Sequence, residues 1–334
     1  MSKSLVFITG ATGFIGSHVV ASTLQAGYRV RLSIRKAEQE SLVRSRYPEF
    51  SNNIEVVVLP DLSKPEAFSE NLHGVDYVFH LASPMPGRGN DIHRDYVDPA
   101  VNATLAILNA AQAFKQIKKV VIVSSVLALA PANAVISQSV SVKDNTGEPN
   151  PVDLDATFPE GFSGHALKYS ASKIKAHEAT RDFLVNNTPH YNLITFHPVF
   201  VLGDSLIQQS AEDLGGMNGI FWMSLFSEKP QLANAWVHVR DVADAHVKAL
   251  EIDIETGKEF ILSRPVVSWD EAVSYVKEKY PALGCKLQGP FQGGWTVDTT
   301  AADQTFGPKW RSESTIIDDI VNQQLGFRAK ASSI

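Results

Sequence analysis

The fold of this chain is decided near its N-terminus by the segment Leu5-Val6-Phe7-Ile8-Thr9-Gly10-Ala11-Thr12-Gly13-Phe14-Ile15-Gly16. Its first four residues form an apolar run that predicts a buried strand, and the helix-like stretch 17–26 follows the last glycine. Between them, the three glycines allow a tight turn and a close approach of the backbone to a pyrophosphate at the helix N-terminus. The spacing is G-x-x-G-x-x-G rather than the usual G-x-G-x-x-G, so a plain glycine-rich turn is the alternative to a dinucleotide site.

Strand and helix patterns alternate through the chain after this segment. Alternation predicts a strand at 28–34, and further strands are predicted at 54–59, 75–80, 120–123 and 191–196, of which 120–123 is a β-branched run. Helical spacing predicts helices at 100–114 and 167–186. Because neighbouring parallel strands need crossover helices, the alternation predicts an α/β fold with a doubly wound parallel sheet of the Rossmann type. The stretch 130–164 is rich in Asn, Ser, Asp, Pro and Gly and predicts a long surface loop that helps to cover a substrate.

The alternation of strand and helix patterns becomes less regular beyond Gly203, which indicates that a second region begins there. We expect a dinucleotide-binding domain over residues 1–200, extended by 235–265. A smaller C-terminal substrate-binding region is expected over 201–234 and 266–334.

The composition is that of an ordinary globular protein, with 334 residues of which 44% are hydrophobic and 20% charged. A net charge of -6 and scattered basic residues argue against a nucleic-acid partner. The apolar runs are too short for a signal peptide or a membrane span, so we expect no membrane partner. A single cysteine, Cys285, permits no internal disulfide and favours a reducing compartment, so we expect a cytoplasmic protein.

Three side chains later in the chain carry candidate chemistry. Tyr169 and Lys173 are four residues apart on a predicted helix, so both face one ligand, and the ammonium is expected to lower the phenol pKa toward the working range. Ser125 ends the strand at 120–123, at the sheet edge where ligands bind, and its hydroxyl is placed to hold a carbonyl oxygen. The alternatives are a half-buried tyrosine beside a solvated lysine and a helix-capping serine. With the glycine turn, the three residues indicate an NAD(P)-dependent carbonyl reductase or its reverse.

The chain resembles the extended short-chain dehydrogenase/reductases. The most similar group contains dihydroflavonol reductases, cinnamoyl-CoA reductases and fungal NADPH-dependent aldehyde and methylglyoxal reductases. The resemblance covers nearly the whole length and rests on segments 9–16, 61–62, 80–84, 121–125, 169–173, 197–203 and 237–243.

The resemblance implies a role for each matching residue. Ser125 is the catalytic serine, with Ser124 as the second choice, Tyr169 is the general acid, and Lys173 binds the nicotinamide ribose. Asn102 supports a proton relay or is a structural amide. The implied cofactor contacts, in addition to Tyr169 and Lys173, are Gly10, Thr12, Gly13, Phe14, Ile15, Gly16, Asp61, Leu62, Leu81, Ala82, Ser83, Pro198 and Val199.

The end of the second predicted strand indicates which nicotinamide cofactor binds. An NAD enzyme has an acid about 20 residues after the glycine turn, whereas an NADP enzyme has cations for the 2′-phosphate. Arg35 and Lys36 stand here, and Glu38 is the first acid. We therefore expect NADPH, with Arg35 as the main phosphate ligand; a solvated helix start is the alternative.

Six large apolar residues are candidates for the substrate pocket, although core packing is the alternative for each: Met85, Leu127, Phe200, Phe221, Trp222 and Phe226. Such a lining suits an apolar or aromatic ketone or aldehyde. Ala130 replaces the asparagine of flavonoid reductases, and Ala166-Leu167-Lys168-Tyr169 replaces the motif of cinnamoyl-CoA reductases ahead of the lysine, so neither plant substrate is expected.

The sequence predicts an NADPH-dependent reductase of an aldehyde or ketone, acting as a monomer or homodimer on a small-molecule carbonyl substrate. The alternatives are an NAD-dependent sugar-nucleotide epimerase and a non-catalytic NADP-binding regulator. No spacing of His, Cys or carboxylate residues indicates a metal site. His238, just before a predicted helix start at Arg240-Asp241, is expected to be a structural hydrogen-bonding residue.

Overall fold

The computed structural model describes residues 3–83, 89–137, 139–307 and 309–331. Within these residues, seven strands form one sheet in which every neighbouring pair is parallel. Their order across the sheet is β10 (Glu259–Leu262), β7 (Asn192–Pro198), β5 (Lys119–Val123), β4 (Tyr77–His80), β1 (Leu5–Thr9), β2 (Arg29–Ile34) and β3 (Ile54–Val58). The predicted doubly wound parallel sheet is confirmed.

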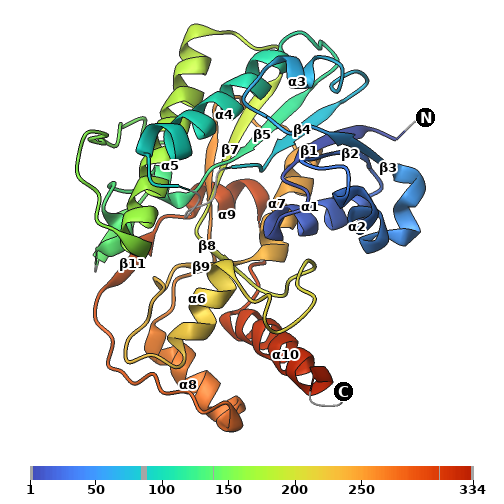
Figure 1. Cartoon of the computed structure of the whole chain (residues 1–334). Coiled ribbons are helices and arrows are strands. Elements are labelled where there is room, and N and C mark those ends of the chain that lie inside the picture. Colours follow the sequence, from blue (N-terminus) through green and yellow to red (C-terminus); the bar gives the residue numbers. More distant parts are fainter. Residues whose placement is uncertain (1–2, 84–88, 138, 308, 332–334) are drawn as a thin grey trace.

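Helices cover both faces of the sheet (Figure 1). One face carries α1 (Phe14–Gln25), α7 (Val239–Glu251) and α9 (Thr300–Phe306), and the other carries α3 (Glu66–Ser69), α4 (Asp98–Ala111) and α5 (Gly161–Asn186). The short helix α2 (Gln39–Arg46) follows β2. Because both faces are covered, every residue of β1 is buried, with Ile8 in one core cluster and Phe7 in the other.

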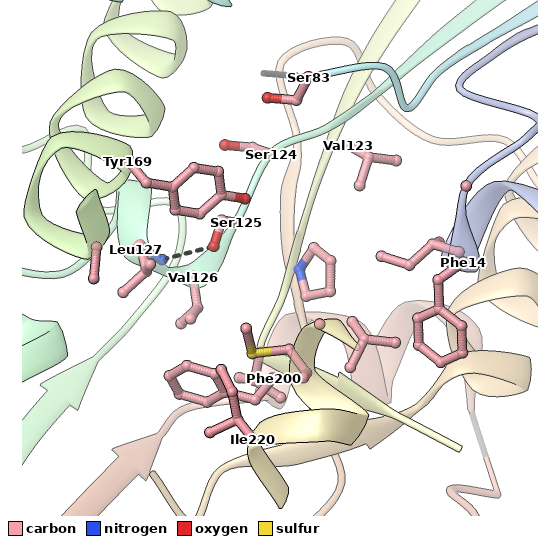
Figure 2. A pocket seen from close by; sticks show the side chains of 18 of the residues that line it. Phe14, Ser83, Val123, Ser124, Ser125, Val126, Leu127, Tyr169, Phe200 and Ile220 are labelled. Atoms are coloured by element: carbon pink, nitrogen blue, oxygen red, sulfur yellow. Dashed lines mark hydrogen bonds between the residues drawn. The ribbon is translucent and has the colours of Figure 1, made fainter. Parts of the chain in front are cut away.

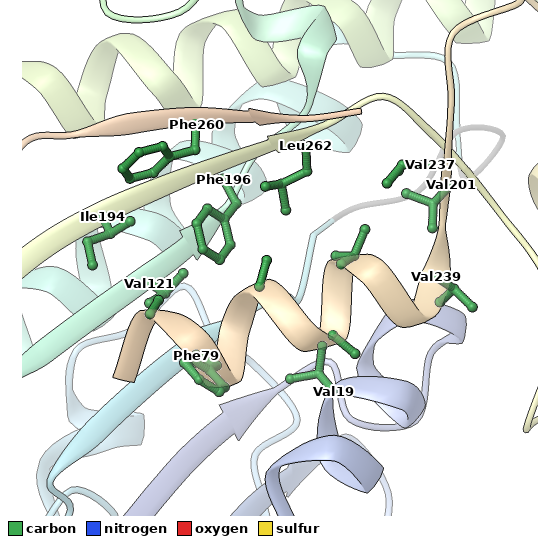
Figure 3. Close-up of a cluster of buried hydrophobic side chains, with 14 of the residues drawn as sticks. Val19, Phe79, Val121, Ile194, Phe196, Val201, Val237, Val239, Phe260 and Leu262 are labelled. Atoms are coloured by element: carbon green, nitrogen blue, oxygen red, sulfur yellow. The ribbon is translucent and has the colours of Figure 1, made fainter. Parts of the chain in front are cut away.

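The larger core cluster lies between the sheet and α7. Phe196 and Phe260 on neighbouring strands stand over this helix, and Phe79 packs against it from β4 (Figure 3). His238 begins α7 as its N-cap, because its Nδ1 accepts the backbone N–H of Arg240 at 3.0 Å. The predicted structural role of His238 is confirmed.

A second group of elements lies at one end of the sheet, in yellow to red in Figure 1. It contains β8 (Phe200–Leu202) paired with β9 (Trp236–His238), and the helices α6 (Gly216–Ser224), α8 (Trp269–Lys279) and α10 (Glu313–Ala331). Their shared core is aromatic: the ring of Trp236 meets those of Phe221 and Trp269 edge-on, at 5.5 and 4.9 Å between centroids. Five short helical turns complete the described elements: Pro48–Asn53, His93–Val97, Val126–Ala128, Ala134–Ile136 and Pro281–Leu283.

The structure differs from the sequence expectation at stretch 130–164. This stretch is not irregular throughout: it contains β6 (Ser139–Val142), which pairs in parallel with β11 (Gly294–Val297), and α5 begins at Gly161 rather than at residue 167. The strand forms because Val140 and Val142 turn into the core while the two serines stay exposed. The expectation of a single long loop was therefore wrong. No described helix has the length and apolar character that crossing a bilayer requires.

Candidate active site

A cleft of about 2160 Å³ runs along the carboxyl ends of the central strands. It extends from the glycine turn after β1 to the loops around α6 and β11. Open α/β sheets bind ligands at this edge, where the strand order reverses, and here β1 lies between β2 and β4. Drug-sized ligands fill roughly 300–1,000 Å³. The cleft therefore has room for a dinucleotide and a second molecule together.

The glycine turn requires glycine for reasons of space. Gly10 has φ +76°, and a Cβ there would lie 2.8 Å from the backbone nitrogen of Ala82. A Cβ on Gly16 would lie 2.1 Å from the carbonyl oxygen of Gly10. Gly13 donates its N–H to the same oxygen at 3.0 Å and caps α1. The turn therefore brings the N-terminus of α1 and its unpaired N–H groups to the cleft, a geometry that fits a pyrophosphate.

Two basic residues follow β2 at the same end of the cleft. Arg35 and Lys36 are exposed and line it, and their backbone N–H groups both donate to the Oε1 of Gln39, at 3.0 and 3.1 Å. Within the described ranges, neither side chain has an ion-pair partner. Asp61 also lines the cleft, where hydrogen bonds from Ser63 lower the pKa of its carboxyl group.

The side chains of Tyr169 and Ser125 lie near each other in the lining of the cleft, with Ser124 and Ser83 beside them (Figure 2). Tyr169 comes from α5 and Ser125 from the end of β5. Ser125 has an extended backbone, and its Oγ accepts the N–H of Leu127 at 3.2 Å. That bond orients the serine oxygen and leaves its own proton for another acceptor.

Lys173 lies one turn after Tyr169, with its Nζ 5.5 Å from the centroid of the tyrosine ring. Burial raises the pKa of Tyr169 to about 12 and lowers the pKa of Lys173 to about 8. The pKa of the Tyr169 phenol is thus raised by burial in this structure, whereas the sequence led us to expect a phenol pKa lowered by Lys173. At neutral pH Tyr169 keeps its proton, which is the state that a proton donor needs.

The structure brings most of the predicted site residues to this cleft. Lys173 is the exception among the predicted cofactor contacts, since it is buried behind Tyr169 and is not part of the lining. Asn102, on α4, is exposed in the cleft. The other predicted contacts in the lining are Gly10, Thr12, Gly13, Phe14, Ile15, Gly16, Arg35, Lys36, Asp61, Leu62, Leu81, Ala82, Ser83, Pro198 and Val199.

The predicted substrate pocket is only partly assembled. Leu127 and Phe200 line the cleft, and Figure 2 shows Phe200 across from Tyr169. Phe221 and Trp222 are instead buried in the aromatic core, and Phe226 packs on Trp222, so the structure does not place these three in the lining. Met85 lies outside the described residues.

Several apolar residues of the lining were missed by the sequence analysis. On α6 they are Met217 and Ile220, which line the cleft, whereas Phe221 on the same helix is buried in the aromatic core. Their spacing of three residues was a usable signal, but the sequence does not say which face of an apolar helix meets the cleft. The other missed apolar residues include Ile136, Phe162, Trp269, Phe291 and Trp295.

Two clusters of potential metal ligands come together from distant parts of the chain, which explains why sequence spacing does not reveal them. One contains His177, His197 and Glu259, and the other contains Asp204, His238 and Asp319. In each cluster an arginine already binds a carboxylate: Arg181 binds Glu259 and Arg240 binds Asp319. Both clusters therefore have the character of ion-pair networks, and neither lines the cleft.

Known proteins resemble the chain over its whole length. The model of the NAD-dependent epimerase/dehydratase family matches residues 6–199. Ketoreductase sphI of Aspergillus fumigatus is 34% identical over 98% of this chain and 99% of that protein. The NADPH-dependent methylglyoxal reductase GRE2 of Saccharomyces cerevisiae is 28% identical over 97% of this chain and 99% of that protein.

Solved structures agree with these relatives. The crystal structure of yeast methylglyoxal/isovaleraldehyde reductase Gre2 complexed with NADPH has a TM-score of 0.82 at 26% identity, and covers 97% of this chain and 99% of that chain. Vestitone reductase from alfalfa has the same fold, with a TM-score of 0.77 at 23% identity over 97% of this chain and all of that chain. The expected resemblance is confirmed: the chain belongs to the NAD-dependent epimerase/dehydratase family, within the extended short-chain dehydrogenase/reductases.

Proposed function

We propose that this protein is an NADPH-dependent reductase that converts an aldehyde or ketone into the alcohol. The proposal rests on one observation above all: Tyr169 and Ser125 line the same cleft as the glycine turn. A proton donor and a dinucleotide site thus share one cavity. The names of the relatives, a ketoreductase and an NADPH-dependent methylglyoxal reductase, support the same class of reaction.

Each of the three polar residues has a distinct task in this reaction. The glycine turn and Arg35 would hold NADPH, which when bound would supply the hydride for the carbonyl carbon. Ser125 uses its O–H to hold the carbonyl oxygen, because its Oγ already accepts the N–H of Leu127. Tyr169 donates its proton to that oxygen as negative charge develops there, which completes the alcohol. Lys173, beside the ring of Tyr169, stabilises the phenolate until a proton from water replaces the one transferred.

The preference for NADPH is attributed to Arg35 and Lys36. Both are exposed at the end of β2 in the cleft, where a dinucleotide bound to this fold places the 2′-phosphate of its adenine ribose. The planar guanidinium of Arg35 suits two parallel hydrogen bonds to the phosphate, and Lys36 adds a second positive charge. Asp61 and Leu62 lie in the same part of the lining and suit the adenine ring.

The substrate is proposed to be an apolar or aromatic carbonyl compound, held by the region of residues 201–234 and 266–334. This region contributes Met217, Ile220, Trp269 and Trp295 to the cleft. Ile136 and Phe162 line the same cleft and are 58% and 68% exposed. Large apolar side chains that stay in water at a cleft mouth favour an apolar ligand that covers them.

Steady-state turnover tests the proposal. The purified protein is given NADPH or NADH with methylglyoxal, isovaleraldehyde, an aromatic ketone and a ketoester, and loss of the reduced cofactor is followed by absorbance. We expect turnover with NADPH, a higher kcat/KM for the apolar carbonyls, and weaker use of NADH. Failure to oxidise NADPH with any carbonyl compound would contradict the proposal.

Two outcomes would favour the alternatives. Tightly bound NAD with turnover of a sugar nucleotide would favour an epimerase, and NADP binding without any turnover would favour a regulator. We also propose a cytoplasmic location and a monomeric or homodimeric state; fractionation and light scattering test these two points.

A further inference from the structure

A fully buried histidine stands directly behind Ser125. His197, on β7, is 0% exposed, and its Nδ1 lies 3.0 Å from the backbone carbonyl oxygen of Ser125. A carbonyl oxygen only accepts hydrogen bonds, so the proton of this imidazole is on Nδ1. Burial lowers the pKa of His197 to about 3, so the ring is a neutral donor at neutral pH and holds the peptide group of Ser125.

The same histidine is connected to the helix that carries Tyr169. Residues Tyr169, Lys173, His177 and Arg181 follow one another at intervals of four, so they form one stripe along α5. The ring of His177 meets the ring of His197 edge-on, with 4.5 Å between centroids. The stripe that presents the proton donor thus continues into a contact with the residue that holds Ser125.

Glu259 on β10 locks this stripe to the sheet. Its carboxylate accepts two hydrogen bonds from Arg181, at 2.8 and 2.9 Å, and lies 3.1 Å from the Nε2 of His177. Asn145 holds the same strand, since its amide donates to the carbonyl oxygen of Glu259 at 2.7 Å and accepts the N–H of Glu259 at 3.0 Å. Through these hydrogen bonds Glu259 ties Arg181 of α5 and the Asn145 loop to β10.

We propose that His197 is a positioning residue that holds Ser125 in register with Tyr169, and that Glu259 and His177 anchor this arrangement to α5. His197 does not touch the substrate; it acts through the Ser125 peptide. Its catalytic consequence rests on the proposed reductase function, but its effect on the Ser125 backbone does not.

A pair of amide substitutions separates positioning from general packing. His197→Asn places a donor near the position of Nδ1, whereas His197→Gln places its donor one bond further along the side chain, away from the Ser125 carbonyl. Because small displacements of reacting groups cost on the order of 100-fold in rate, we expect kcat to fall about 10- to 100-fold in His197→Gln. In His197→Asn we expect kcat to stay within about threefold of the wild type. The Kd for NADPH should be unchanged in both.

Hydrogen–deuterium exchange gives a second measurement that needs no turnover. The amide of Leu127 is bonded to the Ser125 Oγ, so it should exchange faster in His197→Gln and at the wild-type rate in His197→Asn. Equal kcat in wild type and His197→Gln, or equal exchange at Leu127 in all three proteins, would overturn the proposal. Equal impairment of both variants, with equal loss of Tm, would show a packing role only. If the wild type lacks reductase activity but the exchange pattern holds, the proposed function fails and the positioning role stands.

Discussion

A single methyl group at Gly16 should disable the cofactor turn. The Cβ of Gly16→Ala would lie 2.1 Å from the carbonyl oxygen of Gly10 and 2.8 Å from its carbonyl carbon. Ordinary contact begins at 3.4 Å, so the two backbone segments must separate by more than 1 Å. The atoms of Gly10 in this contact belong to the backbone, so no flexible side chain can move aside. Gly10 in turn lies close to the backbone of Ala82.

The expected magnitude follows from that displacement. Overpacking a close contact costs about 1–3 kcal/mol, and we expect the free energy of unfolding to fall by this amount. The same displacement moves the turn away from the pyrophosphate. If this displacement also weakens the binding free energy of NADPH by about 1–3 kcal/mol, the Kd for NADPH rises roughly 5- to 150-fold.

Two measurements check the Gly16→Ala prediction: urea unfolding for stability and NADPH fluorescence titration for Kd. Gly326→Ala is the matched control, because nothing lies within 4 Å of a Cβ at this exposed helical position. The control should bind NADPH as the wild type does and be slightly more stable, since alanine is the better helix former. Wild-type stability and NADPH affinity in Gly16→Ala would refute the reasoning.

Three further predictions concern charge. Arg35→Ala should raise the KM for NADPH on the order of 10- to 100-fold with little change for NADH, because it removes charge-assisted bonds to the 2′-phosphate. Lys115→Ala is the control, because Lys115 is exposed and outside the cleft lining, and it should alter neither KM. Equal effects of Arg35→Ala on both cofactors would defeat the assignment. The pKa of Lys173 in the protein without ligands is lowered to about 8, so its charge is lost as pH rises through 8 and kcat/KM should decline there. Lys173→Arg should flatten this decline, and a pH profile unchanged by the substitution would contradict the prediction. The third prediction concerns Glu313, whose pKa is raised by burial to about 7. As pH falls from 7 toward 5, the carboxyl group of Glu313 therefore binds a proton in the folded protein before it does so in the unfolded chain. Stability should therefore rise as pH falls from 7 toward 5, and urea unfolding of Glu313→Gln should show a smaller rise.

The sequence predicted the sheet well because its signals are local. β1 and β5 are apolar runs and β2 alternates polar with apolar residues, so each has a local signal, and the glycine turn ties β1 to a helix. The position of the predicted catalytic residues could also be inferred from the sequence, because strand ends in a parallel sheet share one edge and residues four apart on a helix share one face. Ser125 and Tyr169 meet in the cleft for these two reasons.

Features that depend on distant contacts were not predictable in the same way. The strand β6 pairs with β11, which lies more than 150 residues later in the chain, and its alternating Ser-Val pattern is too short to outweigh the polar loop around it. On α6, Phe221 and Ile220 are neighbours in sequence, but one faces the aromatic core and the other the cleft. The pKa of Tyr169 depends on burial, which the spacing of Tyr169 and Lys173 does not reveal.

Single-turnover kinetics of Tyr169→Phe test the central claim most directly. The substitution removes the phenolic proton and keeps the ring that packs beside Lys173. With NADPH bound at the wild-type Kd, we predict that reduction of a carbonyl compound slows on the order of 100- to 10,000-fold, the usual contribution of a positioned acid. A Tyr169→Phe protein that binds NADPH normally and reduces the carbonyl at a near-normal rate would contradict the account.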